Sequence, residues 1–304
     1  MRTKTKVWLL IATFCVLAGC ILFAGVMASL KWDFLRLSTT EYEINVHEIS
    51  QDFDRISMNT DTADIVFLLS NDGRCRVECY EEKNAKHTVA VEDGTLKIEQ
   101  VDDQKVFRLI TFIGINFESP KITVYLPKAE YASLLIVEST GDIKVPQDFM
   151  FENVDIFSNT GDVWLNASAS GMIKIGTSTG DIHVENISAG ALELTVSTGK
   201  ILLADIVCQN LTSTGETGDI SLKNLIAEVR ISIERDTGDV RFEGVDAGEI
   251  YVTTDTGDVT GTLLTDKQFT AKSDTGRVRV PQSAAGGKCQ ITTTTGDIRL
   301  EIQP

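Results

Sequence analysis

The dipeptide Thr-Gly returns along the second half of the chain at a nearly constant interval, and this repeat constrains the fold more than any other feature. From one dipeptide to the next, the threonines lie 19 or 20 residues apart. Chance does not produce such regularity, and periods of this length are typical of solenoids built from one repeated structural unit. The dipeptides begin at Thr140, Thr160, Thr179, Thr198, Thr217, Thr237, Thr256, Thr275 and Thr295.

Apolar residues alternate with polar ones inside each repeat. A β-branched residue stands three positions after each threonine, and another apolar residue usually follows two positions later, as with Ile182 and Val184. Such alternation indicates short strands with one buried face. A single unit cannot bury that face alone, whereas stacked units bury a continuous core. We therefore predict an all-β fold, a single-stranded β-helix or solenoid of about nine coils of 19–20 residues over 136–304.

The glycine of each dipeptide is predicted to form the corner of a coil. Glycine adopts a positive φ angle at little steric cost, and it has no Cβ atom to clash at a crowded turn. We therefore assign a structural turn role to Gly141, Gly161, Gly180, Gly199, Gly218, Gly238, Gly257, Gly276 and Gly296.

An aspartate follows most of these glycines and can hydrogen-bond to local backbone amides. In stacked coils the carboxylates would form a column with a spacing of ~5 Å, and Ca²⁺ between the coils would relieve their repulsion. Solvated turn residues are the simpler interpretation, and both stay open. Lys200 and Arg277 replace aspartate in two coils and would break or neutralise the column. The candidate column is Asp142, Asp162, Asp181, Asp219, Asp239, Asp258 and Asp297.

The part of the chain before the repeat, 38–135, is also rich in β-forming residues but is less regular. We expect it to cap the solenoid or to form its first coils with long insertions, because a bare solenoid end invites aggregation. Asp93-Gly94 predicts a hairpin, and Thr62-Ala63-Asp64 looks like a degenerate corner. Strands are predicted near 41–46, 56–58, 65–69, 74–80, 87–91, 96–98, 106–113 and 122–126.

An uncharged apolar segment at 7–30 is long enough to cross a ~30 Å hydrocarbon core as a helix. Arg2, Lys4 and Lys6 precede it, so residues 1–6 are predicted to be a cytoplasmic stub, with the rest of the chain outside the cell membrane. Two alternatives to a retained anchor remain. The first is a cleaved signal peptide, although the segment is longer than a usual signal-peptide core. The second is a lipoprotein. The sequence Leu-Ala-Gly-Cys at 17–20 resembles a lipoprotein processing site, which would place a lipid on Cys20.

Composition and spacing disfavour several classes of function. The net charge is −16, with 44 acidic and 28 basic side chains, and such a surface repels nucleic acid. The six cysteines show neither a disulfide framework nor a zinc spacing, and the three histidines lack a metal-ligand pattern. Asp-Thr-Gly, the tripeptide of aspartic proteases, begins at Asp236, Asp255 and Asp274, but it recurs at the repeat period and is interpreted as a corner. We therefore predict that the protein is not an enzyme and that it binds no cofactor.

The repeated Thr-Gly-Asp-Ile/Val corners resemble the DUF4097 family, bacterial surface and envelope proteins described as adhesins, with β-solenoid ectodomains. The upstream runs Asp-Gly-Thr-Leu-Lys-Ile at 93–98 and Ile-Thr-Val-Tyr-Leu-Pro at 122–127 fit the same family, so the resemblance covers roughly 50–300. It implies a β-solenoid, which we expect to be right-handed, and it carries no catalytic residues over to this chain.

Two functions follow as hypotheses. The first is a membrane-anchored, extracytoplasmic, adhesin-like module for binding or surface display, whose regular flank suits wall polymers or envelope proteins. The second is a sensor or regulator of cell-envelope stress. Because the predicted cytoplasmic stub has only about six residues, signalling would require a membrane partner.

Overall fold

The computed structural model describes residues 3–29, 31–32, 41–101 and 119–303. Helix α1 (Thr3–Ser29) and the β structure from Glu43 onward belong to separate compact units. The helix begins four residues before the predicted segment at 7–30 and contains one span, Val7–Ser29, that is long and apolar enough to cross a membrane. The strand predicted at 106–113 lies outside the described residues.

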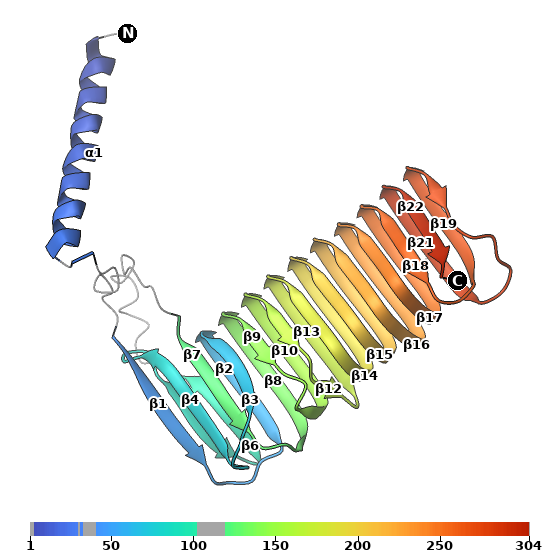
Figure 1. Cartoon of the computed structure of the whole chain (residues 1–304), viewed down its shortest axis with the longest axis horizontal. Coiled ribbons are helices and arrows are strands. Elements are labelled where there is room, and N and C mark those ends of the chain that lie inside the picture. Colours follow the sequence, from blue (N-terminus) through green and yellow to red (C-terminus); the bar gives the residue numbers. More distant parts are fainter. Residues whose placement is uncertain (1–2, 30, 33–40, 102–118, 304) are drawn as a thin grey trace. The chain divides into compact units, whose positions relative to one another are not determined.

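The β unit is a solenoid in which strands of successive coils pair in parallel (Figure 1). Its coils are about 20 residues long and make about eight turns, close to the nine coils predicted. The strands are β1 (Tyr42–Ile49), β2 (Arg55–Thr62), β3 (Asp64–Leu69), β4 (Cys75–Glu82), β5 (His87–Glu92), β6 (Thr95–Gln100), β7 (Lys121–Leu126), β8 (Glu130–Thr140), β9 (Ile143–Val145), β10 (Met150–Thr160), β11 (Val163–Leu165), β12 (Ser168–Ala169), β13 (Met172–Thr179), β14 (Ile182–Thr198), β15 (Ile201–Thr217), β16 (Ile220–Thr237), β17 (Val240–Thr256), β18 (Val259–Leu263), β19 (Lys267–Thr275), β20 (Val278–Arg279), β21 (Gly287–Thr295) and β22 (Ile298–Ile302).

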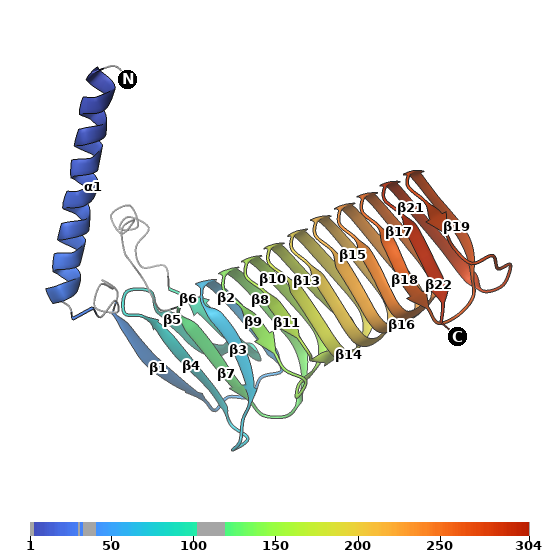
Figure 2. The same ribbon diagram turned by 45° about the horizontal axis from the view of Figure 1, so that its top comes forward.

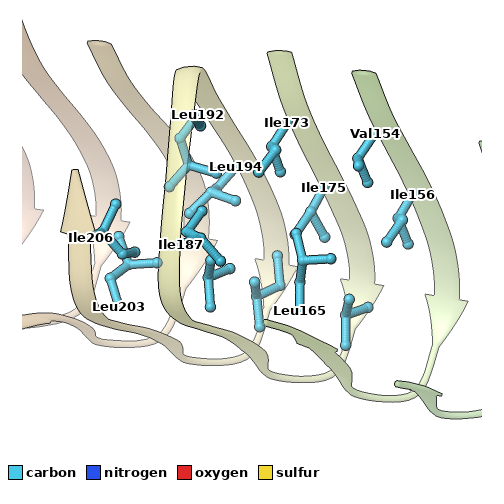
Figure 3. Close-up of a cluster of buried hydrophobic side chains, with 14 of the residues drawn as sticks. Val154, Ile156, Leu165, Ile173, Ile175, Ile187, Leu192, Leu194, Leu203 and Ile206 are labelled. Carbon is cyan, nitrogen blue, oxygen red and sulfur yellow. The ribbon is translucent and has the colours of Figure 1, made fainter. Parts of the chain in front are cut away.

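The core is formed by the alternating apolar residues that the sequence indicated. Along β13 and β14 the register sets Ile173 beside Leu192 and Ile175 beside Leu194, and all four side chains are buried. Figure 3 shows these residues stacked in rows along the inside of successive coils. Each fully buried side chain of this size contributes about 1.5–3 kcal/mol, so the continuous core is the main source of stability.

A second corner in four consecutive coils uses residues that tolerate the left-handed region of backbone conformation. Asn186, Asp205, Asn224 and Gly244 have φ angles of 57°, 55°, 49° and 64°. Asparagine, aspartate and glycine enter this region at lower cost than other residues. The sequence analysis missed this corner, although these residue types recur there at the repeat interval.

The coils at the amino-terminal end do not stack in chain order. Strand β2 pairs in parallel with both β6 and β8, and β3 pairs with β7 and β9. The coil formed by β2 and β3 therefore lies between a coil that follows it in the chain and the start of the regular run. Thr62 pairs with Thr140 in this arrangement, so the degenerate corner at Thr62-Ala63 takes its place at the head of the column of corners.

Antiparallel strands complete this end of the solenoid. Strand β5 pairs with β6 in the hairpin predicted at Asp93-Gly94, whose φ angles of 49° and 72° fit a tight turn with two positive φ values. Strand β4 pairs antiparallel with β7, and β1 pairs with β4. The described strands between residues 42 and 136 thus include parallel strands that stack like coils and antiparallel strands at the end of the solenoid, where a cap is expected.

The order is also broken at the carboxyl-terminal end. Strand β21 pairs with β17 on one side and β19 on the other, while β22 pairs with β18 and β20. The last coil of the chain is therefore inserted between its two predecessors, and β19 and β20 form the outermost coil (Figure 2).

Candidate binding surfaces

Each Thr-Gly corner brings the backbones of neighbouring coils into contact. A Cβ atom on Gly238 would lie 2.1 Å from the carbonyl oxygen of Gly218, and one on Gly257 would lie 2.0 Å from that of Gly238. No side chain fits such a gap. The φ angle is +129° to +153° at seven of the nine predicted turn glycines, whereas Gly257 and Gly276 lie outside the left-handed region. Close approach is thus common to the nine corners, and positive φ adds to it at seven.

The aspartates that follow the glycines form a hydrogen-bonded ladder along the solenoid. The backbone amide of Asp181 donates to Oδ1 of Asp162 at 2.8 Å, and the amide of Asp258 donates to Oδ1 of Asp239 at 2.8 Å. The bond crosses from one coil to the next, whereas the sequence predicted a bond within the turn. One oxygen of such an aspartate is taken up by an amide, and the calcium column stays a prediction.

The coil order explains one of the two basic residues in this column. The amide of Arg277 donates to Oδ1 of Asp297 at 2.8 Å, and the amide of Asp297 donates to Asp258 at 2.7 Å. Arg277 is therefore the last rung, where no following coil needs a carboxylate. The prediction that it would break the column is wrong, whereas its Nε atom lies 3.6 Å from Oδ2 of Asp297, close enough to neutralise that carboxylate. Lys200 lies inside the column, and its side chain has no acceptor atom for a hydrogen bond from the backbone amide of Asp219.

The corner threonines form the most regular exposed row in the described residues. All nine side chains are exposed, and the register sets Thr198 beside Thr217 and Thr217 beside Thr237. Adjacent strands lie about 4.8 Å apart, so this flank carries one hydroxyl group per coil at that spacing. We call these nine residues the threonine row.

Trp164 stands on the opposite side of the corner, in a stack of outward-facing side chains. Its ring is stacked on His183 with a centroid distance of 5.4 Å, and the ammonium group of Lys144 lies 4.4 Å from its centroid. The register sets Trp164 between Lys144 and His183. These neighbours occupy both faces of the indole, so we interpret the stack as a ladder that stabilises the coils.

An exposed apolar patch lies on the flank formed by β8 and β10. Leu135, Val137 and Phe157 are 40%, 41% and 45% exposed, and the register places Val137 beside Phe157. The ring of Phe157 extends over the next coil, where a Cβ atom on Gly176 would lie 3.1 Å from Cδ2. Apolar side chains gathered in this way on a polar surface are typical of contact sites.

The cap contains a buried polar cluster that the sequence analysis missed. Nδ1 of His87 lies 2.7 Å from Oε2 of Glu81, which also accepts the backbone amide of His87 at 2.7 Å. Oε1 of Glu81 accepts Nδ2 of Asn45 at 2.7 Å. One ligand atom each of Cys79, Glu81 and His87 lies within 4.8 Å of the others. Burial raises the pKa of the Cys79 thiol to about 12, which favours its protonated form.

A cavity of about 420 Å³ opens between the start of β4 and the start of β8. Phe53 and Tyr131 stack in its wall with a centroid distance of 6.1 Å, and the Tyr131 hydroxyl donates to the carbonyl of Pro127 at 2.9 Å. Burial raises the pKa of Tyr131 above its ordinary range. The lining combines backbone, apolar groups and scattered charged groups of both signs, without a nucleophile paired with a base.

Comparison with known proteins fits this architecture. The sequence profile of the toastrack DUF4097 family matches residues 53–243 and 229–303. The chain belongs to this family. The match begins inside the irregular part of the ectodomain, so early coils and regular repeat are covered together.

Solved structures of low sequence identity share the toastrack fold. A candidate lipid-binding protein from Parabacteroides distasonis has a TM-score of 0.53 at 15% identity, covering 87% of this chain and 98% of its own. A candidate adhesin from Parabacteroides merdae has a TM-score of 0.51 at 12% identity, with the same coverage. At these identities the likeness shows the fold alone. No curated protein is significantly similar to the chain.

The toastrack chain offers no assembled catalytic site among its described residues. Asp236, Asp255 and Asp274, which begin the protease-like tripeptides, are exposed at corners of the flank and do not line a cleft. The description of the matched family names no catalytic activity. The candidate sites are therefore the threonine row, the apolar patch and the cap.

Proposed function

We propose that this protein is a membrane-anchored, non-enzymatic binding module of the adhesin type that holds extended polymers of the cell envelope. Family membership, the candidate adhesin among the similar structures and the rigid solenoid support this proposal. In this proposal α1 is retained as a single-pass anchor, with a cytoplasmic amino terminus and an extracytoplasmic solenoid. The basic residues before the apolar span support that orientation.

The observation that carries the proposal is the threonine row. It presents the same donor and acceptor group once per coil, in a register fixed by backbone hydrogen bonds. A polymer with regularly spaced hydroxyl or amide groups can contact several rungs at once. Each contact is weak, but contacts on a rigid scaffold add without further ordering cost, which raises the total affinity.

Co-sedimentation of the chain from residue 31 onward with isolated bacterial wall material tests this proposal. We expect saturable binding and a loss of at least about tenfold when Thr198, Thr217 and Thr237 are replaced together by valine. The matched control replaces Thr260 and Thr262, on another side of the coil, by valine. Equal binding by both variants, or no saturable binding by the unmodified chain, would refute the proposal. Repeating the assay with calcium and with a chelator tests the aspartate column.

The second candidate is a regulator of envelope stress that acts through a membrane protein. The apolar patch favours it, because exposed apolar side chains on a sheet flank suit a protein partner better than a polar polymer. Replacement of Phe157 by serine should then abolish co-purification of a specific membrane protein with the full-length chain. Loss of wall binding in the same variant would instead assign the patch to the polymer.

A further inference from the structure

Three arginines gather at the carboxyl-terminal end of an otherwise acidic solenoid. Arg277 and Arg279 belong to the outermost coil, and Arg299 belongs to the inserted coil beside it. The register sets Arg279 directly beside Arg299, and both side chains are exposed on the same face. In a chain of net charge −16 this is a local reversal of sign. We call these residues the arginine cluster.

The cluster is only partly neutralised by the protein. Nε of Arg277 lies 3.6 Å from Oδ2 of Asp297, while Oδ1 of Asp297 already accepts the backbone amide of Arg277. Among the described residues, neither Arg279 nor Arg299 forms an ion pair. Like charges directly opposite each other on adjacent strands are destabilising, so the side-by-side guanidinium groups cost free energy unless an anion lies between them.

A pocket lies where such an anion would bind. It has a volume of about 130 Å³ and is lined by Arg277, Arg279, Asp297, Ile298 and Arg299. A water molecule occupies about 30 Å³ of the liquid, so the pocket holds a tetrahedral oxyanion with some hydration. Guanidinium groups bind phosphate through paired N–H donors, and these are stronger than neutral hydrogen bonds.

We propose that the arginine cluster is a binding site for a phosphate group. The acidic remainder of the solenoid repels polyanions along its length, so a phosphate-bearing polymer or surface would contact the protein only at this end. A terminal phosphate, a phosphodiester of an envelope polymer and a lipid headgroup share this chemistry. Arg279 and Arg299 lie on the strands that follow the corner, while Arg277 stands at the corner itself. The proposal does not depend on the threonine row.

Calorimetry of the full-length chain in a non-ionic detergent tests the site, with inorganic phosphate as the probe at constant ionic strength. We expect saturable binding that weakens with added salt and falls at least about tenfold in the double variant Arg279→Gln, Arg299→Gln. The control is Arg241→Gln, in the same outward column two coils away, which should bind like the unmodified chain. Absence of saturable binding, or an equal loss in the control, would overturn the proposal.

A second measurement separates ligand binding from a purely structural role. Charged residues near a sheet end can simply keep solenoids from joining end to end. Sedimentation velocity should find the double variant as monodisperse as the unmodified chain. Self-association of the variant with unchanged phosphate affinity would overturn the proposal. Parallel titrations with poly(glycerol phosphate) and with phosphatidylglycerol vesicles identify the source, and the tighter of the two is the natural form of the ligand.

Discussion

The coils in the regular middle of the solenoid stack in chain order, whereas the coils at its two ends do not. From β8 to β17 each coil pairs with the coil that precedes it in the chain. At the amino-terminal end the coil of β2 and β3 lies between β6–β7 and β8–β9. At the other end the coil of β21 and β22 lies between β17–β18 and β19–β20.

This difference separates two kinds of information in the sequence. The repeat specifies the shape of one coil, and in the middle every neighbour is equivalent, so chain order decides the stacking. At the ends one coil loses a neighbour, and its apolar side chains are left partly exposed. Val278 of the outer coil is 41% exposed, whereas Ile298, at the equivalent position of the inserted coil, is fully buried.

Removing the inserted coil should have the largest effect. A chain that stops at residue 286 loses Cys289, Ile291, Ile298 and Leu300, whose relative exposures are 0%, 0%, 0% and 3%. At about 1.5–3 kcal/mol for each of the three aliphatic side chains, their burial is worth about 4.5–9 kcal/mol before any rearrangement. We expect β19 to lose hydrogen-exchange protection and the melting temperature to fall sharply.

The matched control deletes residues 267–286, one period of the repeat, which removes the outermost coil and keeps the pairs β17–β21 and β18–β22. It should be much less destabilising than the terminal truncation. If the internal deletion were the more destabilising of the two, the result would indicate that the end coils stack in chain order.

A side chain at a regular corner should have the next largest effect. Gly238→Ala places a Cβ atom 2.1 Å from the carbonyl oxygen of Gly218, and the coils must separate to admit it. We expect a loss of about 3–5 kcal/mol in the free energy of unfolding, measured by chemical denaturation. Gly73→Ala in the irregular end is the control, since nothing lies within 4 Å of its Cβ position, and it should cost about 1 kcal/mol. Similar costs at both sites would contradict the close approach.

Glu138 marks the border between the two regions and should give stability a dependence on pH. Burial raises the pKa of this carboxyl from 4.5 to about 7 in the folded protein. The folded state therefore binds the proton more tightly than the unfolded state, so the contribution is full below about pH 4.5 and is lost as pH rises through 7. The loss should be roughly 2 kcal/mol between pH 5 and pH 8.

The variant Glu138→Gln tests this assignment, because it keeps the oxygen that accepts the amides of Ala63 and Thr140 and removes the titration. Its unfolding free energy should lack that fall. If the variant retains the pH dependence of the unmodified chain, another group is responsible.

The aspartate ladder should give the smallest effect. Asp239→Ala removes the acceptor for the amide of Asp258, and water can replace part of it at this exposed corner. We expect a loss of about 0.5–1.5 kcal/mol. Arg277→Ala, at the end of the ladder, should change stability by less than about 0.5 kcal/mol, because no further coil depends on that side chain. Equal losses in the two variants would show that the ladder does not act between coils.

The coil could be predicted from the sequence because its causes are local. Alternation placed Leu192 and Leu194 inside, and the dipeptide at Thr217-Gly218 marked a corner that only glycine fits. The order of the end coils could not be predicted, because the coils of Ile298 and Val278 carry the same pattern. One signal was available in Arg277, which lacks the carboxylate that most interior rungs supply, but Lys200 lacks it inside the column as well.

The candidate sites were less predictable because they depend on pairing. His87 meets Glu81 across a turn, six residues away in the chain, and this separation matches none of the metal-ligand spacings sought in the sequence. The apolar patch needs the register that sets Val137 beside Phe157. The phosphate site needs Arg279 and Arg299 on neighbouring strands with a pocket beside them.

Disulfide trapping of the inserted coil tests the stacking most directly. The register sets Thr253 beside Thr292, and adjacent strands about 4.8 Å apart allow a disulfide between exposed cysteines. The double variant Thr253→Cys, Thr292→Cys should oxidise readily to an intramolecular disulfide, whereas Thr253→Cys, Lys272→Cys should not. Efficient cross-linking of the second pair and not the first would show that the coils stack in chain order and would contradict the fold described above.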